Sequence, residues 1–220
     1  MPNWAFSKVT ISGDYETVTE IKNRLATPYA SPYNPEEMKQ GVFLLWNIIK
    51  PNNLEAYLGK EQKAFDEIIN ADPELAELKE PEPNSPDLES IMDKVIREMA
   101  TSDNWYEWNC RNWGTKWEIG DKAILEYELP SYHADDSTHL ELGYRMESAW
   151  APPYEAINKL AEQYPDITIN LSSIDESDCW AMSAQWIDGK MFYEQDEDIT
   201  HNFGMDLRGY CNLECCNEYE

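Results

Sequence analysis

One aromatic segment places the strongest constraint on how this chain can fold. Residues 104–117 read Asn-Trp-Tyr-Glu-Trp-Asn-Cys-Arg-Asn-Trp-Gly-Thr-Lys-Trp. Aromatic side chains bury large apolar areas, so this segment is expected to anchor a core. The spacing of Trp105, Trp108 and Asn112 predicts a helix, with Ser102 or Asp103 as its N-cap.

The end of the same segment predicts a turn into a strand. Gly114 suits the left-handed conformation that often follows a helix. Thr115, Trp117 and Ile119 then alternate with charged residues, which is the period of a half-buried strand. The segment is therefore expected to join a helix to a strand.

The rest of the chain alternates strand and helix patterns. Strands are predicted from alternation or apolar runs, and two helices from apolar stripes. The predicted strands are 4–12, 42–49, 125–129, 140–146, 167–171, 179–187 and 191–193. The predicted helices carry the stripes Val18, Ile21, Leu25 and Ile157, Leu160, Ala161, Tyr164. Asp188-Gly189 predicts a two-residue hairpin turn between the last two strands.

Three blocks of sequence occur together and carry a family resemblance. They are Met1-Pro2-Asn3-Trp4, the aromatic segment 104–117, and Ser148-Ala149-Trp150-Ala151-Pro152-Pro153. The chain resembles the YubB-like family of phage and plasmid proteins over residues 1–50 and 100–195. Ala5 stands where many members have Cys, and Ala151 where Ser is usual. The resemblance implies a ferredoxin-like domain, and it supplies no catalytic residues that could be carried over to this chain.

Pattern and resemblance together predict an α+β fold. We expect a ferredoxin-like antiparallel sheet with helices on one face, spanning residues 1–195. A helical, acidic insertion is expected at about residues 53–100, and an acidic, cysteine-containing tail at residues 196–220. Trp180, Trp186 and Phe192 are expected to be core residues.

The charge balance narrows the possible partners. The chain has 43 acidic and 17 basic residues, a formal net charge of −26. Binding of nucleic acid requires cations to displace counterions, so direct contact with nucleic acid is not expected. Anionic membranes are disfavoured for the same reason. The charge either confers solubility or imitates nucleic acid for a basic partner.

No motif selects an enzyme, a metal or a cofactor. Cys211, Cys215 and Cys216 with His201 lack the second ligand pair of a structural zinc site. His133 and His139 flank Asp135-Asp136 in what reads as a polar hairpin loop. Phosphate-binding, dinucleotide-binding and nucleophile motifs are absent from the sequence. We therefore predict no catalytic residues, no metal site and no cofactor.

These observations lead to one main hypothesis and two alternatives. The main hypothesis is a cytoplasmic, non-enzymatic phage or mobile-element protein that binds and inhibits a basic host protein. The expected target is a nucleic-acid-binding protein of host defence, engaged by DNA mimicry. The predicted contacting acids lie outside the resemblance: Asp72, Glu74, Glu77, Glu80, Glu82, Asp87, Glu89, Asp196, Glu197 and Asp198. One alternative is a small-ligand-binding protein or hydrolase, with a pocket between the insertion and the sheet that collects Asp135, His139 and Asn112. The other is a scaffold protein whose charge only confers solubility.

Overall fold

The computed structural model describes residues 3–58, 104–132 and 138–212. The chain divides into two compact units, one formed by Met1–Lys50 with Asn109–Glu220 and the other by Pro51–Trp108. Within the described part of the chain, no helix is both long and apolar enough to cross a membrane.

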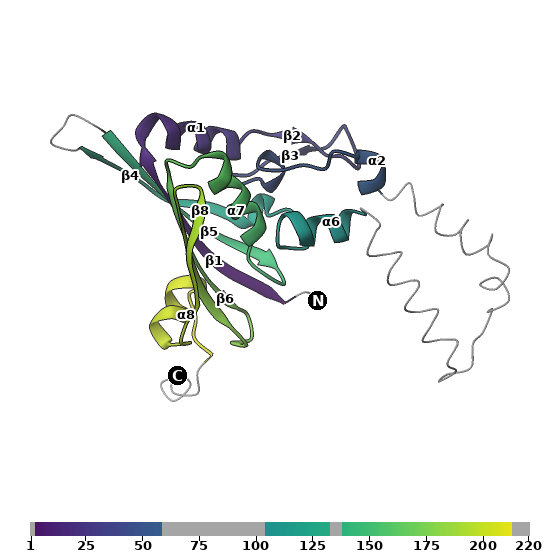
Figure 1. The fold of residues 1–220 in the computed structure, drawn as a ribbon. Helices are drawn as coiled ribbons and strands as arrows, with labels where there is room; N and C mark the ends of the chain where they lie inside the picture. The colour runs from purple at the N-terminus through teal and green to yellow at the C-terminus, as the bar shows by residue number, and fades with distance from the viewer. Residues whose placement is uncertain (1–2, 59–103, 133–137, 213–220) are drawn as a thin grey trace, which may run out of the picture. The chain divides into compact units, whose positions relative to one another are not determined.

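The first unit is built on a six-stranded antiparallel sheet (Figure 1). The strand order is β4-β5-β1-β6-β7-β8. The strands are β1 (Trp4–Asp14), β4 (Ala123–Tyr132), β5 (Thr138–Ala149), β6 (Thr168–Asp175), β7 (Ala181–Ile187) and β8 (Lys190–Asp196). The helices are α1 (Tyr15–Leu25), α7 (Tyr154–Gln163) and α8 (His201–Arg208), with 3-10 turns η1 (Leu45–Asn47) and η2 (Gly120–Lys122). A two-stranded ribbon pairs β2 (Tyr29–Ala30) with β3 (Met38–Lys39).

The predicted fold class is confirmed by the connections. The order β1, α1, β4, β5, α7, β6 is a βαββαβ unit with β1 and β5 in the middle of its four strands, which is the ferredoxin-like arrangement. The hairpin of β7 and β8 extends this sheet by two strands. Its Asp188 and Gly189 have φ of 53° and 71°, the positive values that a tight hairpin turn requires.

The main core lies between one face of the sheet and the helices α1 and α7. Val9 and Ile11 of β1 are fully buried, and Ile11 is in register with Leu142 on one side and Ile169 on the other. Because side chains alternate along a strand, these residues share one face. Trp186 of β7 is also fully buried, as predicted, and its Nε1 donates to Asn158 of α7 at 3.1 Å.

The opposite face of the sheet is covered at one end by α8. Ile174 and Ala181 are paired across β6 and β7 and pack with Leu207 of α8 and the partly buried Phe6. The tail has no clear apolar period, so α8 was not predicted from the sequence. The helix starts at Thr200, whose side chain accepts from the N–H of Phe203 at 3.2 Å.

A buried arginine holds α8 in place. The Arg208 side chain is fully buried, and its Nη1 donates to the carbonyl of Asp175 at 2.8 Å. Its Nη2 lies 2.5 Å from Asp178 Oδ1. A buried cation is stable only when it is paired and hydrogen-bonded, so these contacts fix the end of the helix on the turn between β6 and β7.

Two strand predictions are wrong. Residues 42–49 form no strand: Phe43, Leu44 and Leu45 are buried as expected, but the backbone makes the 3-10 turn η1. Residues 115–119 also form no strand, although Thr115 and Ile119 are buried. In the first segment the carboxylate of Glu118 binds the backbone N–H groups of Leu45 and Trp46, which a strand would pair with a neighbour. In the second, the side chain of Asn109 donates to the carbonyl of Lys116 and so takes the place of a strand partner there.

The second unit is described only at its two ends. It contains α2 (Leu54–Tyr57), and Tyr57 packs edge-to-face on Trp108 at 5.7 Å between ring centroids. The predicted helix is present as α6 (Trp105–Asn112), but the predicted cap is wrong: Asn104 Oδ1 accepts from the N–H groups at positions 106 and 107. The predicted helical insertion otherwise lies outside the described residues.

Candidate functional site

The predicted acidic contact residues divide into two groups. Asp72, Glu74, Glu77, Glu80, Glu82, Asp87 and Glu89 lie outside the described residues. Asp196, Glu197 and Asp198 are described, and the structure places them at the end of β8 and just beyond it. The local structure around β8 therefore decides what these three acids can do.

Strand β8 is an exposed edge of the sheet. All seven of its residues are exposed, and in the described part of the chain it pairs only with β7 (Figure 1). The register slips at β7, so that Met191 opposes Trp186 and Tyr193 opposes Gln185. Phe192, between them, is the bulged residue and is 69% exposed, which makes its predicted place in the core wrong.

The backbone of β8 presents donors to solvent at acidic positions. The N–H of Glu197 donates to Ala181 of β7 at 2.9 Å. Because successive N–H groups alternate in direction along a strand, those of Glu194 and Asp196 point away from β7. These groups are available to another strand.

The edge is strongly acidic. Between residues 190 and 198 one lysine, Lys190, stands against four acids: Glu194, Asp196, Glu197 and Asp198. Glu197 is held against the sheet by the hydroxyl of Ser183 and by Gln195 Nε2 at 2.6 Å. These two hydrogen bonds lower the pKa of Glu197, the one from Ser183 more strongly, so its carboxylate stays ionised.

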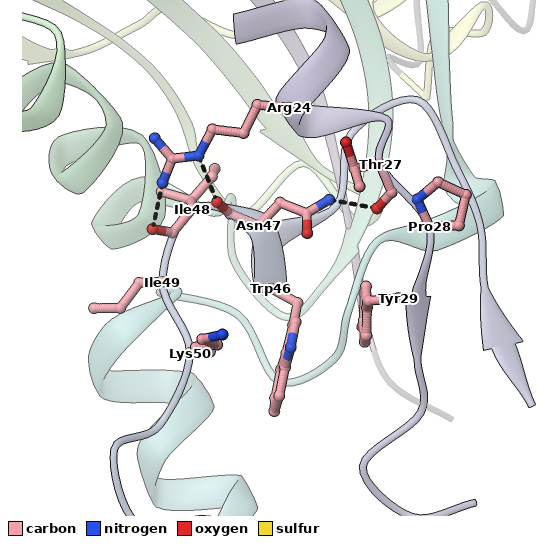
Figure 2. Close-up of a pocket in the computed structure, with 9 residues that line it drawn as sticks. All are labelled: Arg24, Thr27, Pro28, Tyr29, Trp46, Asn47, Ile48, Ile49 and Lys50. Carbon is pink, nitrogen blue, oxygen red and sulfur yellow. Dashed lines mark hydrogen bonds between the residues drawn. The ribbon is translucent and has the colours of Figure 1, made fainter. Parts of the chain in front are cut away.

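A pocket of about 460 Å³ lies at the C-terminal end of α1 (Figure 2). Its lining comes from α1, the segment before and in β2, and η1 with the residues after it. The lining residues are Arg24, Thr27, Pro28, Tyr29, Trp46, Asn47, Ile48, Ile49 and Lys50. In the view of Figure 2, Arg24 and Lys50 lie on one side of Trp46, and Thr27, Pro28 and Tyr29 lie on the other.

Backbone carbonyls hold the pocket arginine. Arg24 Nε donates to the carbonyl of Asn47 at 2.8 Å, and its Nη2 donates to that of Ile48 at 3.3 Å. Asn47 Nδ2 in turn donates to the carbonyl of Thr27 at 2.7 Å. The guanidinium therefore fixes η1 against α1 and leaves its positive charge without a paired carboxylate among the lining residues.

The aromatic pair in the pocket is positioned by Glu118. Tyr29 and Trp46 stack at 5.3 Å with an interplanar angle of 12°. Glu118 Oε2 accepts from the Tyr29 hydroxyl and the Trp46 N–H, each at 3.0 Å, and Oε1 accepts from the N–H groups of Leu45 at 2.7 Å and Ile119 at 3.0 Å. Burial raises the pKa of Glu118, and the hydrogen bonds oppose that change.

Two residues of the predicted alternative pocket, Asn112 and His139, are described by the structure. His139 lies near the start of β5, whereas Lys116, four residues after Asn112, donates from its N–H to Ala149 at the far end of that strand. Asp135 lies outside the described residues. Cys215 and Cys216 do also, and in the described part no group of three His, Cys, Asp or Glu side chains could hold a metal.

The sequence patterns did not predict the pocket, and they did not show that β8 lies at the edge of the sheet. Trp46 falls in the strand predicted at residues 42–49, and no motif connects it with Arg24, Tyr29 or Lys50. Nothing in their spacing signals that they meet, because the contact is made through a 3-10 turn. For β8, the Asp188-Gly189 turn gave the hairpin, but a pattern of side chains does not reveal which strand lies at an edge.

The fold defines the class: the first unit is a ferredoxin-like α+β domain with an added edge hairpin. Residues 112–203 match the family model described as the ferredoxin-like domain in Api92-like protein, and this part of the chain is similar to that domain. A crystal structure of a protein api92 from Yersinia pseudotuberculosis aligns with a TM-score of 0.39 and 8% identity, covering 91% of this chain and 99% of that one. No curated protein sequence matches the chain.

Proposed function

We propose that this protein is a non-enzymatic interaction protein that binds a basic protein partner through strand β8. The observation that carries the proposal is the combination, on one strand, of an open hydrogen-bonding edge and an excess of acids. Addition of a strand to an exposed sheet edge is a recurrent mode of peptide recognition, in which main-chain hydrogen bonds supply affinity and alternate side chains supply specificity.

The geometry of β8 specifies the partner segment. Glu194 and Asp196 offer outward N–H groups, and their side chains share one face of the strand. An incoming strand therefore places every second side chain opposite these carboxylates, and Lys or Arg is the complement. Opposite-charge pairs across neighbouring strands contribute roughly 0.2–1 kcal/mol each, so alternating cations are favoured over a block of the same charge.

The net charge supports a finer version of the proposal. A chain of −26 attracts basic surfaces over long range, which speeds association at low salt. Basic surfaces commonly serve to bind nucleic acid, so the proposed partner is a nucleic-acid-binding host defence protein. It would be inhibited when carboxylates of this chain occupy its basic surface in place of phosphates. The origin in a phage or mobile element rests on the YubB-like resemblance.

A pair of synthetic peptides tests the strand-addition step. The first alternates Arg and Val, and the second has the same composition with all Arg residues in one block. Both are titrated into ¹⁵N-labelled protein at about 50 and 300 mM salt, and amide shifts are followed by NMR. We expect the alternating peptide to bind more tightly and to shift the amides of β8. Equal binding of both peptides would contradict strand addition and leave only non-specific electrostatic attraction.

Two substitutions at one position separate the main chain from the charge. Asp196→Asn removes the carboxylate, whereas Asp196→Pro also removes the outward N–H, and at an edge position it leaves the bonds to β7 in place. We expect the asparagine variant to bind the alternating peptide about 1.5–5-fold more weakly, from the pair energy above, and the proline variant more weakly still. Asp166→Asn, at an exposed loop position, is the charge-matched control.

Capture from a host lysate tests the partner class. The full chain should retain a basic nucleic-acid-binding protein at low salt, and duplex DNA should compete for it. Retention that DNA does not affect would contradict the mimicry step while leaving strand addition intact. Retention unchanged in the Asp196→Pro variant would contradict binding through β8.

A further inference from the structure

We propose that the pocket between α1 and η1 binds a small organic anion that carries a flat ring, such as a nucleoside monophosphate. The site shares no residue with β8, so it is independent of the proposed interaction function. It lies wholly within the first unit, and its volume of about 460 Å³ is in the range of small-molecule sites.

The charge of the pocket runs against that of the chain. Its nine lining residues include two cations, Arg24 and Lys50, and no acid, although the chain has 43 acids. A concave site lined by one sign of charge concentrates the field there. The acids elsewhere in the chain repel anions, so this pocket is a place on the described surface where binding of an anion is favoured.

The two cations have different roles. Arg24 is held by the carbonyls of Asn47 and Ile48 and by the hydroxyl of Tyr164 at 3.1 Å, so it supplies a fixed positive charge. Lys50 is exposed, and none of the described residues pairs with its ammonium group. A lysine of this kind can turn to meet a phosphate or carboxylate as a mobile point charge. Lys50 is therefore the proposed direct contact to the anionic group.

The stacked pair of Tyr29 and Trp46 is the reason to expect that the ligand contains a flat ring. Trp46 is partly exposed and is stacked on Tyr29 on one side, with Lys50 on the other side in Figure 2. A flat ring that packs on such a preformed aromatic surface gains stacking energy without ordering the side chains first. The hydrogen bonds of Glu118 hold this surface in place before any ligand arrives.

Titration with four probes tests the ligand class: adenosine monophosphate, adenosine, inorganic phosphate and benzoate. Calorimetry gives the affinity, and amide shifts of residues 46–50 give the location. We expect adenosine monophosphate to bind at least about tenfold more tightly than adenosine or phosphate, because the ring and the anion each contribute. Benzoate binding at the same amides, as strong as that of the nucleotide, would identify an aromatic carboxylate as the natural chemistry.

Variants of the pocket residues test whether the nucleotide binds in this pocket. Lys50→Gln should weaken binding of the nucleotide about tenfold, since a charge-assisted contact is lost. Lys122→Gln, at another exposed lysine in the first unit, should leave it unchanged. Trp46→Phe keeps an aromatic ring and should weaken both adenosine and the nucleotide while sparing phosphate. The proposal is overturned if none of the four probes shifts residues 46–50, or if both lysine variants act alike.

Discussion

The carboxylate of Glu118 should be a main determinant of the structure around the pocket, and Glu118→Gln tests this. Its two oxygens accept four hydrogen bonds, three from backbone N–H groups and one from the Tyr29 hydroxyl. Glutamine has nearly the same shape but replaces one acceptor by an NH₂ donor. Some of the four donors must then face another donor.

The cost follows from which donors lose their acceptor. If the NH₂ group replaces Oε1, two backbone N–H groups, those of Leu45 and Ile119, become unpaired. If it replaces Oε2, the Tyr29 hydroxyl can turn to accept, and only the N–H of Trp46 is unpaired. The second orientation is cheaper, and one unsatisfied buried donor costs about 1–3 kcal/mol. The free energy of unfolding should fall by that amount.

The assay is thermal unfolding with a local readout beside it. For a chain of this size, a loss of about 2 kcal/mol lowers Tm by roughly 4–8 °C. Hydrogen exchange should speed up at the amides of Leu45 and Trp46, which a distant defect would not change. Glu36→Gln is the control, because Glu36 is exposed and its side chain makes no hydrogen bond to any residue that the structure describes. Equal Tm values for the two variants would refute the reasoning.

Two further predictions concern α8 and β8. Arg208→Gln should lower the free energy of unfolding by about 3 kcal/mol and speed hydrogen exchange throughout α8, because it leaves the Asp178 carboxylate without its buried partner. The control Lys159→Gln breaks only an exposed ion pair and should cost less than about 1 kcal/mol. Similar hydrogen exchange in the two variants would contradict this prediction. The pKa of Glu197 should lie below its usual range in an NMR titration, and Ser183→Ala should raise it. Because the pKa of Glu197 is lowered in the folded state, its carboxylate contributes to stability above the unfolded-state pKa, and this contribution is lost as the pH falls through the folded-state pKa. If Ser183→Ala left the pKa of Glu197 unchanged, the hydrogen bond from Ser183 would not be its cause.

Much of the sheet could be predicted because strands such as β1 and β5 have buried residues at every second position. In β1 every second residue from Ala5 to Ile11 is buried, and the same holds for β5 from Leu140 to Met146. Such alternation arises whenever one face of a strand is packed and the other is open, so it is visible without knowledge of the partners. The two helices on the packed face follow for the same reason.

The pocket could not be predicted because it depends on contacts between distant segments. Residues 42–49 have the apolar composition of a buried strand, and they are buried, but Glu118 binds the backbone at Leu45 and Trp46 and turns it into η1. That carboxylate lies more than 70 residues later in the chain. A local pattern shows that a segment is buried, but it does not show which distant group satisfies its backbone.

Net charge alone cannot give this protein a specific partner, because a charge of −26 attracts any cation and repels any anion. Specificity requires positions where backbone and charge are arranged together. Many of the cations are already neutralised locally by carboxylates within 4.0 Å: Lys8, Lys22, Lys39, Lys122, Arg145, Lys159 and Arg208. The edge of β8 adds outward N–H groups to its acids, and the pocket adds a stacked aromatic pair to Arg24 and Lys50. Each proposed site would thereby discriminate by geometry among ligands that charge alone would treat alike, which is why the decisive experiments compare probes that differ in shape as well as probes that differ in charge.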